Sequence, residues 1–83
     1  MNQKSKRKIK IEFGNIKPNF KTNFYTASNE RFVEGKTLIA FAKFFEDGSI
    51  ADKYINVLYQ DNFTDVTIII NLDYFTEYKI TFI

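Results

Sequence analysis

The amino-acid sequence predicts a small antiparallel all-β fold, a barrel or sandwich of five to six strands. Two observations favour this class. Polar and apolar residues alternate in residues 8–13, 65–72 and 78–82, which is the period of a half-buried strand. The chain also has ten Phe, five Tyr and eleven Ile among its 83 residues. Such aromatic and β-branched residues prefer strands, and fifteen aromatic side chains can form a compact core.

The first predicted strand covers residues 8–13, where charged and apolar residues alternate, and Gly14 with Asn15 ends it. A second strand is predicted from Phe20 to Thr26. Residues 27–35 show little periodicity, so we expect a connection or a short helical turn there.

Residues 36–59 are open to two interpretations. As helices, they would carry an apolar stripe with residues three and four positions apart, ending at Gly48. A second helix would then begin at Ser49. The fold would in that case be α+β, with one or two helices in residues 36–60.

As strands, the same residues would form a hairpin around Asp47-Gly48, a pair typical of a two-residue type I′ turn. That turn dictates a register that pairs Ala40 with Ile55 and sets residues of opposite charge across from each other. We favour the hairpin, because the aromatic and β-branched residues of this segment prefer strands.

Residues 65–72 and 78–82 alternate most clearly, with a turn near Asp73 between them. They predict an antiparallel hairpin with one buried face. The second strand ends in Phe82 and Ile83, and an apolar strand at a sheet edge invites pairing with another chain. We therefore also expect a homodimer that pairs through the C-terminal strand.

Charge divides the chain into a basic N-terminal arm, residues 1–7, and a single β-rich domain, residues 8–83. The first ten residues contain five Lys or Arg and no acidic residue, whereas residues 11–83 have a net charge of −3. The arm is open to two interpretations, a solvated segment or a segment that binds phosphates.

The residues for common catalytic chemistry are missing. The chain has no His and no Cys, so the usual nucleophile–base pairs, zinc fingers and disulfides are excluded. Gly35-Lys36-Thr37 is similar to the end of a phosphate-binding loop, but Glu30 stands where that motif needs glycine. The acidic residues lack calcium-loop spacing, and we expect them in solvated turns. We therefore expect no enzymatic activity, no cofactor and no metal.

Two groups of residues are candidates for binding. Exposed aromatic side chains serve as stacking platforms for bases or as anchors in protein interfaces. The basic candidates are Lys4, Lys6, Arg7, Lys8 and Lys10. The aromatic candidates are Phe20, Phe24, Tyr25, Phe32, Tyr59 and Phe63.

The predicted function is a small non-catalytic protein-binding module, because the β-rich domain is net acidic and rich in aromatics. Asn, Lys, Ile, Phe and Tyr, which have AT-rich codons, make up 44 of the 83 residues. This bias favours a phage or mobile-element product, for example an inhibitor of a host nuclease or defence factor. The alternative is a single-stranded DNA- or RNA-binding protein that uses the basic arm and the exposed aromatics.

The lack of Cys and of a long apolar segment predicts a cytoplasmic protein without membrane association.

Overall fold

The computed structural model describes residues 4–21 and 27–83. The strands are β1 (Ser5–Phe13), β2 (Thr37–Phe44), β3 (Tyr54–Asp61), β4 (Thr64–Asn71) and β5 (Tyr78–Phe82). The helices are α1 (Pro18–Lys21), α2 (Ser28–Val33) and η1, a 3-10 helix (Leu72–Tyr74). The predicted antiparallel all-β class is confirmed, because strands dominate and the described helices are short.

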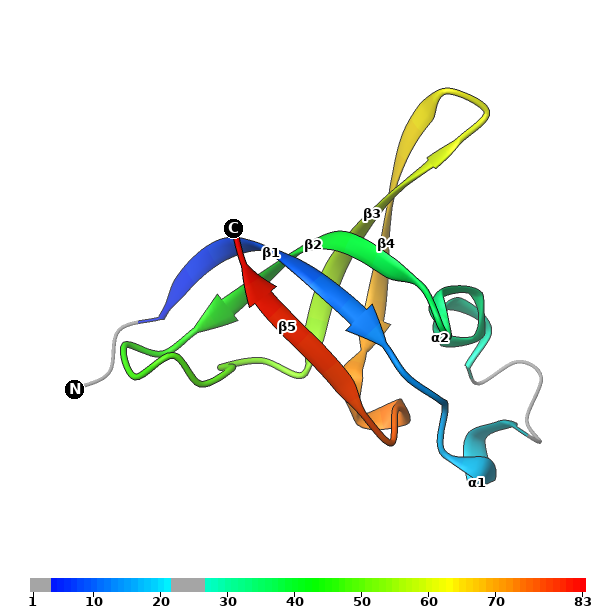
Figure 1. Ribbon diagram of the computed structural model, residues 1–83, viewed down its shortest axis with the longest axis horizontal. Helices are drawn as coiled ribbons and strands as arrows, with labels where there is room; N and C mark the ends of the chain where they lie inside the picture. Colours follow the sequence, from blue (N-terminus) through cyan, green and yellow to red (C-terminus); the bar gives the residue numbers. More distant parts are fainter. Residues whose placement is uncertain (1–3, 22–26) are drawn as a thin grey trace.

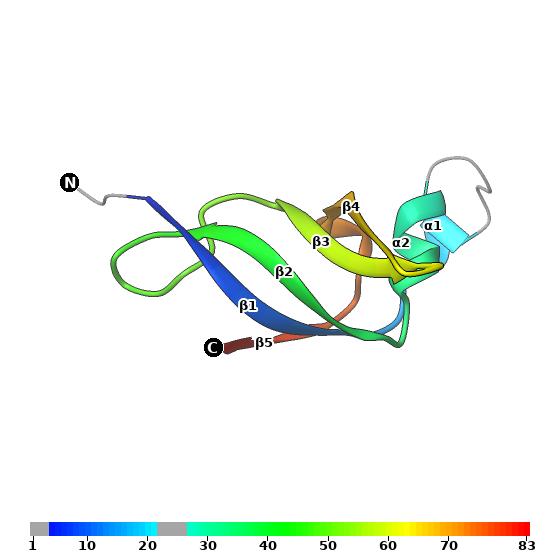
Figure 2. The same ribbon diagram turned by 90° about the horizontal axis from the view of Figure 1, so that it is seen from above.

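The strands form one antiparallel sheet in the order β4-β3-β2-β1-β5. Over the described residues the sheet is not closed, and β4 and β5 are its two edges. Figures 1 and 2 show that the sheet is strongly curved and that α1 and α2 lie together at one end of it. The β3–β4 hairpin projects away from the rest of the molecule (Figure 1).

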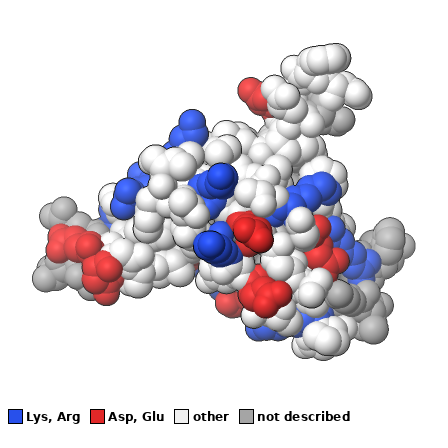
Figure 3. Space-filling view, in the orientation of Figure 1, with Lys and Arg blue, Asp and Glu red and all other residues white. Residues whose placement is uncertain are grey.

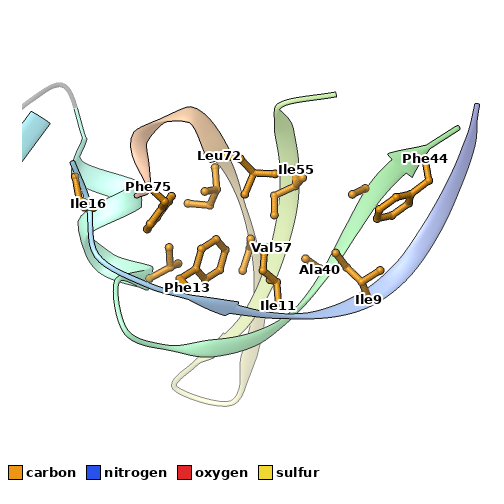
Figure 4. Packing of buried hydrophobic residues seen from close by; sticks show 13 residues of the cluster. Ile9, Ile11, Phe13, Ile16, Ala40, Phe44, Ile55, Val57, Leu72 and Phe75 are labelled. Atoms are coloured by element: carbon orange, nitrogen blue, oxygen red, sulfur yellow. The ribbon is translucent and has the colours of Figure 1, made fainter. Parts of the chain in front are cut away.

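The core lies on the concave side of this curved sheet. Alternation in β1 decides which side chains enter it: Ile9, Ile11 and Phe13 are at most 2% exposed, and the residues between them are exposed. Burying one such side chain contributes about 1.5–3 kcal/mol. Figure 4 shows the cluster that these residues form with side chains from β2, β3 and the segment after β4. Its other labelled members are Ile16, Ala40, Phe44, Ile55, Val57, Leu72 and Phe75.

Helix α2 is fastened across one end of the core by two carboxylates one turn apart. Glu30 is 6% exposed, and its Oε2 accepts a hydrogen bond from the Asn71 N–H at 2.9 Å. Glu34 Oε2 accepts one from the Ile16 N–H at 2.7 Å. Backbone donors at the end of β4 and after β1 therefore find their partners on α2 and on the residue that follows it, and a buried donor without a partner would be costly.

The β2–β3 hairpin confirms the strand interpretation of residues 36–59, but the predicted two-residue turn is wrong. Gly48 has a φ of 89°, whereas Asp47 is not among the residues with positive φ. The Gly48 N–H donates to Phe45 O, and the Phe45 N–H donates to Ser49 O. The loop thus has three residues with a glycine bulge. The Asp47 carboxylate favours it, accepting from Ser49 N at 2.9 Å and from Ser49 Oγ at 2.5 Å.

The register of this hairpin also differs from the predicted one. Ala40 pairs with Val57 instead of Ile55, because residues 51–53 form an extra loop before β3 begins. The shift is two residues, and side chains alternate with a period of two, so each one keeps its predicted face. Ile55 and Val57 are accordingly both buried.

The predicted pairing of the last two strands is wrong. β4 pairs with β3, β5 pairs with β1, and the two lie at opposite edges of the sheet. The chain crosses between them through η1 and through an isolated bridge between Ile16 and Phe75. Alternation reveals that a segment is a strand with one buried face, but it does not identify the neighbouring strand.

Two further boundaries differ from prediction. Phe20 lies in α1 and not in a strand, and Pro18 begins that helix, a position where proline is favoured. The remainder of the predicted second strand, residues 22–26, lies outside the described residues. β1 begins at Ser5 and not at Lys8, so residues 5–7 pair with β2 as part of the sheet.

Candidate functional site

The side of the sheet opposite the core carries a continuous polar and apolar surface, which we call the outer face. On β1 its members are Lys6, Lys8, Lys10 and Glu12, the residues that alternate with the buried ones. Its members on the other strands are Thr37, Ile39, Phe41, Lys43, Tyr54, Asn56, Leu58, Gln60, Asp65, Thr67, Ile69, Asn71, Lys79 and Thr81. These side chains are exposed or half-buried, so no described helix covers the face.

Lysines dominate the half of the outer face formed by β1 and its two neighbours. Lys6, Lys8 and Lys10 follow one another at every second position of β1, about 7 Å apart at a strand rise of ~3.3 Å per residue. Lys6 stands directly across from Lys43 of β2. Like charges directly opposite destabilise a sheet, and a bound anion would relieve that repulsion. Figure 3 shows Lys and Arg side chains over the region that β1 and β5 occupy in Figure 1, with carboxylates among them.

Apolar and aromatic side chains lie beside these lysines on β2, β3 and β4. The register sets Lys8 across from Phe41, Phe41 across from Asn56, and Asn56 across from Ile69. In the next row, Lys10 of β1 lies across from Ile39 of β2, and Ile39 lies across from Leu58 of β3. The outer face therefore passes from cationic to apolar across the strands.

Two aromatic rings of the outer face each have a lysine close by. The Lys6 Nζ lies 5.7 Å from the centroid of the Phe41 ring, and the Lys53 Nζ lies 5.4 Å from that of Tyr54. These contacts are in the range of cation–π attraction. Tyr54 is 50% exposed, so its ring remains open to a ligand.

Three shallow grooves follow one another across the outer face. The first, of about 300 Å³, includes Lys6, Phe41, Lys43, Tyr54, Asn56 and Ile69 in its lining. The second, of about 270 Å³, lies against Lys8, Ile39, Leu58, Tyr59, Gln60 and Asp65. The third, of about 250 Å³, is bounded by Lys10, Glu12, Thr37, Lys79 and Thr81. A small-molecule site would enclose most of its ligand, whereas a row of open grooves suits an elongated ligand that follows the lysines of β1.

The basic residues singled out from the sequence are divided between two sides of the sheet. Lys6, Lys8 and Lys10 share the outer face. Lys4 precedes β1, and its Nζ lies 5.8 Å from the centroid of the Phe45 ring. Arg7 belongs to the opposite side, where its guanidinium carbon lies 4.1 Å from the centroid of the Phe82 ring.

The aromatic candidates do not gather at one place. Phe20 stacks on Tyr74 with ring centroids 4.2 Å apart and packs against the core. Phe32 pairs with Tyr59 at 4.7 Å, and Phe32 is 43% exposed. Phe63 lies alone in the turn of the β3–β4 hairpin. Phe24 and Tyr25 lie outside the described residues.

Sequence reasoning missed four residues that complete the outer face: Phe41, Lys43, Tyr54 and Lys79. Phe41 and Lys43 are the odd-numbered positions of β2, and the buried residues of that strand are even-numbered. The alternation could therefore have placed both on the exposed side, once the segment was recognised as a strand.

The described residues contain no group of three or more His, Cys, Asp or Glu side chains that could hold a metal ion. None of the helices in the described ranges is long and apolar enough to cross a membrane. Comparison of the chain with protein-family models, curated proteins and solved structures found no match. The outer face itself is therefore the basis for assigning a function.

Proposed function

We propose that the protein binds single-stranded DNA or RNA across the outer face of its sheet. One observation carries the proposal: three consecutive outward residues of β1 are lysines, and the first of them, Lys6, shares a groove with the half-buried Phe41 ring and the exposed Tyr54 ring. The lysine spacing of about 7 Å is comparable to the distance between consecutive phosphates of an extended polynucleotide. A lysine row with neighbouring stacking platforms is how sequence-independent single-strand binding is achieved.

Electrostatics favours this ligand over the protein partner predicted from the sequence. That prediction rested on a net acidic domain beside a basic arm, but residues 5–10 are part of the sheet. The positive charge is therefore fixed on a folded surface instead of a separate arm. Fixed cations release counterions from a polynucleotide without first losing the conformational freedom of a flexible segment. The protein-binding role remains a prediction, and its strongest support is the exposed tip of the β3–β4 hairpin.

The aromatic side chains would supply the part of the affinity that salt does not remove. Stacking of one base on an aromatic ring contributes about 1–3 kcal/mol and tolerates any base. Phe41 and Tyr54 line the same groove, so both are available to bases of a strand whose phosphates follow the lysines. We expect little sequence preference, because the grooves are open and do not enclose a base edge.

Fluorescence polarisation with a labelled oligothymidylate of about 16 nucleotides tests the proposal. Each phosphate neutralised on a single strand contributes about −0.7 to the slope of log K against log salt. Engagement of three or more lysines thus predicts a slope of about −2 or steeper between about 50 and 200 mM salt. A blunt-ended duplex of equal length should bind less tightly, because its bases are not free to stack. No binding to the single strand at about 50 mM salt would refute the proposal.

Matched variants locate the binding surface. Lys8→Glu should weaken binding and flatten the salt slope, because Lys8 lies in the middle of the outer face. Lys17→Glu makes the same change in net charge at an exposed position outside that face, in the loop before α1, and should have a much smaller effect. Phe41→Leu keeps an apolar side chain but removes the ring. The Phe41→Leu variant should bind oligothymidylate about 5- to 100-fold more weakly, while the slope of log K against log salt stays unchanged.

A further inference from the structure

The tip of the β3–β4 hairpin carries an aromatic side chain that contributes nothing to the fold. Asn62 and Phe63 form the turn with φ values of 50° and 69°, the left-handed conformations of a type I′ turn. A bulky residue in this conformation is an outlier, and glycine is the usual second residue. The Phe63 side chain is 101% exposed, so no packing compensates for the strain. An exposed, strained residue at a projecting tip points to a role in binding.

The charges around the tip indicate what Phe63 would bind. Residues 54–78 contain no Lys or Arg, and the tip is flanked in sequence by Asp61 and Asp65. Asp65 is exposed and pairs across the hairpin with Gln60. Carboxylates disfavour a polynucleotide at this place and favour a surface with an apolar floor and a cationic rim.

The outer face offers such a surface in its first groove. Its lining includes the apolar side chains of Phe41, Tyr54 and Ile69 and two cations, Lys6 and Lys43, against one carboxylate, Asp52. Its volume of about 300 Å³ accommodates one aromatic side chain. Apolar contact at the centre with opposite charges at the rim is the arrangement that gives interface anchors their affinity.

The tip cannot reach the groove of its own chain. Asn56 is the groove residue of β3 that lies nearest the turn, and residues 57–61 separate it from the turn. At about 3.3 Å per residue the groove and the tip are about 20 Å apart along a continuous strand. The occupant must therefore come from another molecule.

We propose that Phe63 of one copy of this chain docks into the outer-face groove of a second copy, with Asp65 beside the lysines of the groove rim. The contact is heterologous, because tip and groove are different surfaces. An assembly that does not close into a ring therefore keeps one free tip and one free groove, to which further copies can bind. Docking would cover part of the surface proposed for nucleic acid, so a polynucleotide should reverse it. That competition rests on the proposed function, whereas the docking itself does not.

Sedimentation equilibrium over a wide range of protein concentration tests the docking. The wild type should show concentration-dependent association, and Phe63→Ser should weaken it at least about tenfold. Asp65→Lys and Lys43→Glu should each weaken it, and the double variant should recover it because the charges are again opposite. Circular dichroism checks that each variant is folded.

Ile83→Ser is the matched control, since it also removes an exposed apolar side chain, one that is 63% exposed and follows the edge strand β5. It should leave the association unchanged. The proposal is overturned if the wild type is monomeric throughout, or if Ile83→Ser and not Phe63→Ser weakens the association. The second result would favour the homodimer through the C-terminal strand. Phe63→Ser should retain oligothymidylate binding, so a failure here is distinguishable from a failure of the proposed function.

Discussion

Replacing Phe63 with glycine should stabilise the protein, although it removes the largest exposed side chain of the hairpin tip. Phe63 has a φ of 69° and is fully exposed. The left-handed conformation brings the Cβ atom of an L-residue too close to its own carbonyl oxygen, which costs about 1–2 kcal/mol. Glycine has no Cβ atom and adopts this conformation freely.

The magnitude follows from two opposing contributions. Removing the Cβ strain contributes about 1–2 kcal/mol, and the greater freedom of glycine in the unfolded chain offsets about 0.5–1 kcal/mol of it. No buried area is lost, because the side chain makes no measurable contact with the body of the protein. The expected net gain is therefore about 0.75 kcal/mol, the difference between the midpoints of the two ranges. For a domain of this length it corresponds to a rise in Tm of roughly 2–8 °C.

Thermal and urea denaturation of three variants check this reasoning. Phe63→Gly should unfold later than the wild type, whereas Phe63→Ala keeps the Cβ atom and should match it. Gly48→Ala is the converse control. Gly48 has a φ of 89°, and a methyl group added there would meet no atom within 4 Å, so only conformational strain changes and stability should fall. A loss of stability in Phe63→Gly would show that the Phe63 ring packs against the folded protein. The ring would then have a structural role, which contradicts the inference that it serves binding.

Three other perturbations test the fold. Gly14→Ala would bring a Cβ atom to 2.8 Å from the Glu77 carbonyl oxygen, which forces β1 and β5 apart. We expect a loss of about 2 kcal/mol, and an unchanged urea midpoint would contradict the close approach. Glu30→Ala leaves the Asn71 N–H without its acceptor and should cost about 1–3 kcal/mol, whereas Glu30→Gln should cost clearly less. Hydrogen bonds from the Ser49 hydroxyl and then from its N–H hold the pKa of Asp47 below its ordinary value of 3.8. A lowered pKa stabilises the fold above pH 3.8, and this contribution disappears as the pH falls through the lower folded-state pKa. Asp47→Asn should therefore lose less stability than the wild type between about pH 5 and pH 2, and equal losses would contradict the assignment.

The sequence was sufficient to predict the strand class and half of the outer face. In β1, strict alternation separates Ile9 and Ile11 from Lys8 and Lys10, so the lysines had to share one side. The face of a side chain depends only on local periodicity. For this reason the two-residue register shift in the β2–β3 hairpin did not disturb burial of Ile55.

What the sequence did not predict depends on contacts between distant segments. Phe41 and Tyr54 lie together in one groove because of how β2, β3 and β4 pair, and alternation alone does not choose partners. The predicted pairing of β5 with β4 was wrong for the same reason, since β5 pairs with β1. The turn at Asn62-Phe63 was missed because type I′ turns are recognised by glycine, and phenylalanine stands in its place. That departure from the usual turn chemistry is itself the observation that suggests a binding role.

Nuclear magnetic resonance can locate nucleic-acid binding residue by residue, by titrating the labelled protein with oligothymidylate and following each backbone amide. We predict that the shifted amides concentrate on the strands of the outer face, above all around Lys8, Phe41 and Asn56. Amides of α2 should change little, and those of the hairpin turn at Phe63 should change only through release of the turn from a second copy. Shifts confined to the hairpin turn or to α2, with those of β1 and β2 unmoved at saturation, would contradict binding across the outer face.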